Sequence, residues 1–119
     1  PCLIETAVRI DTGVSGLAAI LTTAEAGPAT PGRGPAVLML NSGSVHLVGP
    51  NRLWVRLARR WATQGVTVLR LDLSGIGDSA PRPGAAENVV YSAHAAADIA
   101  RALAFLETRT GGGDRHLLG

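Results

Sequence analysis

The feature that most constrains the fold is an alternation of short apolar segments with longer stretches of helical periodicity. Residues 36–40, 66–72 and 115–118 are short segments rich in aliphatic side chains. Between them, residues 51–64 and 92–110 carry apolar side chains at intervals of three and four. A continuously apolar strand is typical of a sheet buried on both faces, and parallel strands require crossover connections such as helices. The pattern therefore predicts a β-α-β-α-β unit with right-handed crossovers and a mostly parallel sheet.

Two further strands are expected before this unit. Residues 3–10 are rich in β-branched side chains and alternate loosely, and residues 17–22 form a second such segment. Asp11-Thr12-Gly13 between them is a turn sequence, so the two segments predict an antiparallel hairpin. Residues 26–35 hold three prolines and three glycines and predict a surface loop. The expected fold class is an α/β sandwich opened by a hairpin, with residues 1–119 forming one partial domain.

Both predicted helices are amphipathic. The first has an apolar side and an arginine side, and Gly65 is the expected stop. Its apolar side comprises Leu53, Trp54, Leu57, Ala58, Trp61 and Ala62, and the opposite side comprises Arg52, Arg56, Arg59 and Arg60. The second is expected to bury Ala95, Ala96, Ile99, Leu103 and Leu106. Asp98 and Arg101 in this helix are expected to form an exposed pair.

Composition narrows the classes of function. Apolar residues make up 46% and aromatic residues 3%, which suits a folded chain but provides few rings to stack on bases. The net charge of +2 rests on arginines without a nucleic-acid-binding motif, so no nucleic-acid partner is expected. Cys2 is the single cysteine, and the three histidines have no partners at metal-ligand spacing, so neither a disulfide nor a metal or other cofactor is expected.

Membrane and export signals are not found in the sequence. No apolar run approaches the roughly 20 residues of a membrane span, and no signal peptide is visible. A cytoplasmic protein without membrane contact is therefore expected. The chain starts with Pro1 rather than Met and ends at Gly119, which favours a piece of a longer protein.

The first loop with a candidate role is Asn41-Ser42-Gly43-Ser44, followed by His46. Backbone amides just beyond a parallel strand face the crevice in which such sheets bind ligands. Glycine there allows the backbone to approach a substrate oxygen, and fixed N–H donors are what an oxyanion hole needs. Taken alone, however, the segment favours an ordinary strand-to-helix turn.

The second loop, from Asp72 to Ser79, allows three interpretations. Gly75 and Gly77, with Ala80, match the dinucleotide-binding fingerprint, but the prolines that follow disfavour the helix that this site requires. Gly77-Asp78-Ser79 matches the opening of the GDSL esterase motif, with Ser79 as the nucleophile, although it does not lie directly at a strand end. The third interpretation is a turn in which Asp72, Asp78 and Ser79 bond to local amides.

Together these segments resemble the N-terminal half of the α/β-hydrolase superfamily, over residues 3–119. Residues 40–52 take the place of the oxyanion loop, and residues 69–79 resemble the D-x-x-G-x-G-x-S loop after the fourth strand. Asn41 and Ser42 stand where His and Gly are usual. The Asn-x-Gly and Gly-Pro-Asn-Arg combination is similar to serine-aminopeptidase-like hydrolases, including some associated with exosortase systems.

The resemblance implies a serine hydrolase that cleaves an ester, amide or thioester bond of a small-molecule or peptide acyl substrate through an acyl-enzyme. Gly43 or Ser44 would supply one oxyanion donor. The strand at 115–118 would lead into the G-x-S-x-G nucleophile elbow, with Gly119 as its first glycine. The catalytic Ser, Asp/Glu and His would lie beyond Gly119, so these 119 residues alone are expected to be inactive. The remaining loop residues would shape the site without performing chemistry: Asn41, Ser42, His46, Asp72, Gly75, Gly77 and Ser79.

Overall fold

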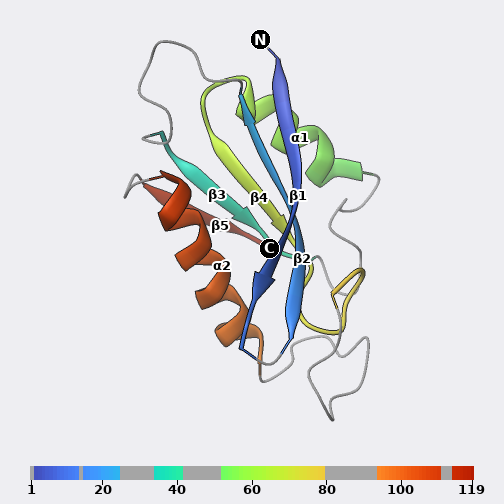
Figure 1. Cartoon of the computed structure of the whole chain (residues 1–119). Coiled ribbons are helices and arrows are strands. Elements are labelled where there is room, and N and C mark those ends of the chain that lie inside the picture. The colour runs from blue at the N-terminus through green and yellow to red at the C-terminus, as the bar shows by residue number, and fades with distance from the viewer. Residues whose placement is uncertain (1, 14, 25–33, 42–51, 80–93, 111–113) are drawn as a thin grey trace.

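A five-stranded sheet packs against two helices in the computed structural model of the chain (Figure 1). The structure describes residues 2–13, 15–24, 34–41, 52–79, 94–110 and 114–119. The elements are β1 Leu3–Asp11, β2 Gly16–Ala24, β3 Ala36–Met39, α1 Leu53–Ala62, β4 Thr67–Leu71, α2 Ala95–Thr110 and β5 Arg115–Leu118. This order confirms the predicted one, and β5 has the predicted bounds.

The sheet has the strand order β1-β2-β4-β3-β5. β1 pairs with β2, and β2 with β4, in antiparallel register, whereas β3 lies parallel to both β4 and β5. Four of the five described strands therefore run in one direction and β2 opposes them. β5 pairs only with β3 among the described strands and forms one edge of the sheet.

The core consists of two clusters, one on each face of the sheet. On one face, Ala102 and Leu106 of α2 pack with Leu38 and Leu69 of the central strands. On the other face, Trp54 and Ala58 of α1 pack with Met39 and Val68. Neighbouring residues of one strand point to opposite faces, so both faces of β3 and β4 are covered. This explains why β3 is apolar throughout and why the apolar residues of β4 do not alternate with polar ones.

The first helix is shorter than predicted because residues 63–65 form the turn that ends it. Gly65 adopts φ +89°, and its N–H donates to Ala62 O at 3.1 Å, which confirms it as the stop. Val55 is buried, whereas Leu53 was expected on the buried side and is 41% exposed. The buried stripe instead follows Trp54, Ala58 and Ala62 at intervals of four.

The second helix buries Leu106 as predicted, but the rest of its fully buried stripe differs from the prediction. Ala96 is exposed, and the fully buried residues recur at intervals of four from Asp98 through Ala102 and Leu106 to Thr110. Ile99 and Leu103 are partly buried against the same cluster. The expectation that Asp98 lies on the surface is therefore wrong.

Candidate functional site

The candidate site lies where the carboxyl ends of β3 and β4 meet. Asn41 follows β3 and Asp72 follows β4, and because these strands are parallel neighbours both residues lie at the same edge of the sheet. The Asn41 Nδ2 donates to Asp72 Oδ1 at 2.8 Å, and Asn41 Oδ1 accepts from the Leu73 N–H at 2.7 Å. Asn41 is 9% exposed and Asp72 is fully buried. One carboxamide thus joins the starts of the two loops that the sequence singled out.

The second loop closes on Asp72 and on β2. The other carboxylate oxygen, Asp72 Oδ2, accepts from the Asp78 N–H at 3.0 Å. The Ser79 hydroxyl donates to Asp72 O at 2.5 Å and accepts from the Ala18 N–H at 2.8 Å. The bond from the Asp78 N–H to Asp72 is one that the turn interpretation predicts, whereas the Ser79 hydroxyl accepts from Ala18 of β2, 61 positions away, and not from a local amide.

Two glycines in this loop adopt backbone conformations with positive φ. Gly75 and Gly77 adopt φ +78° and +56°, in the left-handed region that side chains with a Cβ rarely enter. A side chain with a Cβ would therefore be strained at either position.

The buried carboxylate of Asp98 fixes the same loop from α2. Its Oδ2 accepts from the Ser74 N–H at 2.9 Å, and Asp98 is 1% exposed. Sequence reasoning missed this residue because only apolar side chains were counted in the helical stripe. Its spacing of four from Ala102 and eight from Leu106 is the signal that places it on the buried face.

The stem of the first loop is held from two sides at Leu40. Trp54 Nε1 in the first turn of α1 donates to Leu40 O at 2.7 Å. The Leu40 N–H donates to Leu118 O at 2.8 Å, which joins the stem to the end of β5. The sequence predicted Trp54 only as a core residue, and the polar role of its indole was missed. Ser42, Gly43, Ser44 and His46 lie outside the described residues, so the oxyanion role of this loop stays a prediction.

An ionic cluster on the α1 face ties three elements together. Glu5 of β1 binds Arg59 Nη2 at 2.7 Å through Oε1 and Arg70 Nη2 at 2.9 Å through Oε2. The Thr22 hydroxyl also donates to Glu5 Oε2, at 3.2 Å. Arg70 lies in the middle of the sheet with 5% of its side chain exposed, whereas half of the Arg59 side chain is exposed.

The charges of this cluster act on each other. Burial raises the pKa of Glu5, but the hydrogen bond from Arg59 and the charges of Arg59 and Arg70 outweigh burial and bring the pKa below its ordinary value. Burial lowers the pKa of Arg70 while Glu5 raises it, and a guanidinium stays charged at neutral pH. The cluster fastens β1 and α1 to β4 and is a structural feature of the scaffold.

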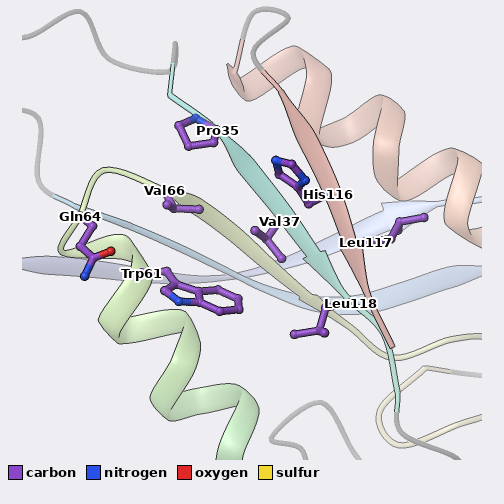
Figure 2. A pocket seen from close by; sticks show the side chains of 8 residues that line it. All are labelled: Pro35, Val37, Trp61, Gln64, Val66, His116, Leu117 and Leu118. Atoms are coloured by element: carbon purple, nitrogen blue, oxygen red, sulfur yellow. The ribbon is translucent and has the colours of Figure 1, made fainter.

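A groove of about 460 Å³ runs along the α1 face beside β5. Figure 2 shows Trp61 of α1, Val37 of β3 and Leu118 of β5 around it. The residues that line it are Pro35, Val37, Trp61, Gln64, Val66, His116, Leu117 and Leu118. The lining is mostly apolar and includes no carboxylate, so it lacks the polar groups that the Asn41–Asp72 region brings together.

The described part of the chain holds no group of three or more His, Cys, Asp or Glu side chains placed to bind a metal ion. Neither α1 nor α2, the two helices described, is long and apolar enough to cross a membrane.

Comparison with solved structures identifies the fold. The chain superposes on the structure of DcsB in complex with its substrate analogue with a TM-score of 0.69 and 19% identity, covering 90% of this chain and 33% of that one. It also superposes on XC6422 from Xanthomonas campestris, described as an α/β serine hydrolase without a lid, with a TM-score of 0.66 and 16% identity, covering 95% of this chain and 49% of that one.

These matches establish likeness of fold, and the chain spans no more than half the length of either protein. No protein-family profile and no curated protein sequence matches the chain. The strand order and the two helices are those of the N-terminal portion of α/β-hydrolases.

Proposed function

We propose that the chain is the N-terminal part of a serine hydrolase that cleaves an ester, amide or thioester bond through an acyl-enzyme. The observation that carries this proposal is the hydrogen bond between the Leu40 N–H and Leu118 O. It places the end of β5 beside the stem of the proposed oxyanion loop. A nucleophile elbow that follows β5 would therefore start next to the loop that donates to the oxyanion.

The proposed chemistry divides between this chain and the residues that follow it. A serine two residues beyond Gly119 attacks the carbonyl carbon, and a later histidine accepts its proton. The amide of Gly43 or Ser44 and the amide after the serine donate to the oxyanion as it forms. The histidine then protonates the leaving group, and water attacks the acyl-enzyme to release the acid. The substrate is a small-molecule or peptide acyl compound, and no cofactor enters any step.

The surroundings of Ser79 argue against its role as a GDSL-type nucleophile. Its hydroxyl donates to Asp72 O and accepts from the Ala18 N–H, and the residue is 4% exposed. An attacking hydroxyl has to be accessible and to pass its proton to a base. Here the proton is shared with a backbone carbonyl, which is too weak a base for that purpose.

The dinucleotide-binding alternative is disfavoured by the two buried carboxylates. Phosphate groups bind to free backbone N–H groups. In this loop the N–H of Ser74 donates to Asp98 and the N–H of Asp78 donates to Asp72. A pyrophosphate would have to displace these carboxylates and overcome their charge, so the hydrolase is the better-supported function.

The experiment compares the complete protein with the 119-residue chain. The complete protein should hydrolyse p-nitrophenyl esters, aminoacyl anilides or acyl thioesters, and the class turned over fastest distinguishes esterase, aminopeptidase-like and thioesterase activity. The 119-residue chain alone should be inactive on all three. Turnover by the 119-residue chain that disappears in Ser79→Ala would contradict the proposal and favour the GDSL alternative.

A further inference from the structure

We propose that Asn41 is a positioning residue for catalysis, and that a neutral carboxamide is required at this position to hold the oxyanion loop. This inference rests on the proposed function and assigns a role to a residue that does not itself touch the substrate. It concerns the point at which Asn41 stands in place of the usual histidine.

The first argument is that both ends of the Asn41 carboxamide are used. Its Nδ2 donates to Asp72 Oδ1 at 2.8 Å while its Oδ1 accepts from the Leu73 N–H at 2.7 Å, and the bridge is buried. An aspartate of the same shape could accept from Leu73 but could not donate to Asp72. It would place a second carboxylate against the first, at a distance where like charges repel strongly in a buried site.

The second argument is the place of this bridge in the chain. Asn41 directly precedes residues 42–51, the segment predicted to hold the oxyanion loop, and Trp54 lies three residues after that segment. Trp54 Nε1 binds Leu40 O, the carbonyl of the peptide that joins Leu40 to Asn41. The entry to the loop is thus fixed at the Leu40 carbonyl by α1 and at the Asn41 side chain by the loop that follows β4.

The third argument is that Asp72 is itself held in place. Its Oδ2 accepts from the Asp78 N–H, and the segment that follows it is fastened to α2 through Ser74 and Asp98. Asn41 therefore links the start of the oxyanion loop to a segment that these hydrogen bonds hold in place. A donor that moves by a fraction of an ångström loses interaction with the transition state more than with the ground state, so loss of the bridge should lower kcat and leave KM nearly unchanged.

The size of the effect follows from what an oxyanion donor contributes. Removal of one donor lowers kcat by about 100- to 1,000-fold. Displacement of the loop leaves part of this interaction, so Asn41→Ala and Asn41→Asp should each lower kcat by roughly 10- to 100-fold. Because the two variants remove the bridge in different ways, agreement between them identifies the bridge as the cause.

The test is made on the complete protein, with Thr110→Val as the matched control. Thr110 is also fully buried, and its hydroxyl donates to Leu106 O at 2.9 Å near the end of α2, which precedes the amino end of β5. The control removes one buried hydrogen bond at the opposite end of the parallel strands. Its kcat should equal that of the wild type, while the Asn41 variants lose kcat and keep KM within about twofold.

Amide exchange provides a readout that needs no substrate. The Leu73 N–H should exchange slowly in the folded wild type and much faster in Asn41→Ala, with core amides of β4 unchanged. Fast exchange of this N–H in the wild type would overturn the inference even if the variants failed to fold.

The kinetic outcomes separate the two proposals. The positioning role is overturned if a folded Asn41→Asp variant keeps the wild-type kcat. It is also overturned if Thr110→Val lowers kcat as much as the Asn41 variants do. Either result leaves the proposed function standing. A complete wild-type protein with no hydrolase activity overturns the proposed function, and the positioning role with it.

Discussion

The Glu5→Gln substitution should destabilise the protein far more than its place near the sheet edge suggests. Gln keeps the shape of the side chain but removes the charge that faces Arg70 at 2.9 Å. Only 5% of the Arg70 side chain is exposed, so its guanidinium cannot rotate toward the solvent and be hydrated again. Its Nε has no hydrogen-bond partner among the described residues, so the Glu5 carboxylate is its main compensation.

The magnitude follows from the exposure of each partner. Removal of one member of a buried ion pair costs about 3–5 kcal/mol, because the other charge stays buried and uncompensated. The Glu5 side chain is 26% exposed, so solvent reduces the expected cost to about 2–3 kcal/mol. Arg59 is half exposed and can rehydrate, so Arg59→Gln should cost no more than about 1 kcal/mol although its bond to Glu5 is the shorter one, at 2.7 Å.

Urea unfolding of the complete protein and its variants measures these costs. The double variant Glu5→Gln/Arg70→Met removes both charges and should lie within about 1 kcal/mol of the wild type, because it leaves no buried charge uncompensated. The reasoning is refuted if Glu5→Gln changes the free energy of unfolding by less than about 0.5 kcal/mol, which is the scale of an ordinary surface substitution. It is also refuted if Arg59→Gln costs as much as Glu5→Gln.

Four further outcomes are expected. The stability that Glu5 contributes should be complete above the ordinary carboxyl pKa of 4.5 and should be lost as the pH falls through its lowered pKa, so urea midpoints of wild type and Glu5→Gln should converge in acid. Asp72→Ala removes the acceptor of Asn41 Nδ2 and of the Asp78 N–H and should cost about 2–5 kcal/mol in the same assay. Gly65→Ala should lower the free energy of unfolding by about 1 kcal/mol, because alanine is strained at a φ of +89°. Gly34→Ala should lower it more, by about 1–3 kcal/mol, because the added Cβ would lie 2.5 Å from Gly65 O. The 119-residue chain alone should associate through the edge strand β5, and a monomeric elution volume with cooperative unfolding would contradict this.

The order of elements could be predicted from the sequence because each central strand is buried on both faces. The apolar segments of β3 and β4 carry that signal directly, whereas β5 is an edge strand whose residues are mostly exposed. The turn before β2 and the stop at Gly65 were predicted because their residue types favour those conformations locally. The strands, the turn and the helix stop could be predicted because each is determined mainly by residues close together in the sequence.

The contacts of the candidate site could be predicted only in part, because they join residues distant in sequence. The sequence located Asn41 and Asp72 at the ends of two strands, but their pairing across 31 positions follows from the order β4-β3 within the sheet. The helical spacing of Asp98 indicates the buried face, but nothing in the sequence reveals that its carboxylate accepts from the Ser74 N–H, 24 positions earlier. The burial of Arg70 likewise depends on Glu5, 65 positions away.

The most direct test of the central claim is to label the complete protein with a fluorophosphonate, which reacts with activated serine nucleophiles, and to locate the label by peptide mass spectrometry. The proposed function predicts a single labelled serine two residues beyond Gly119, with labelling abolished when that serine is replaced by alanine. Labelling of Ser79, or no labelling of the folded protein, would contradict it.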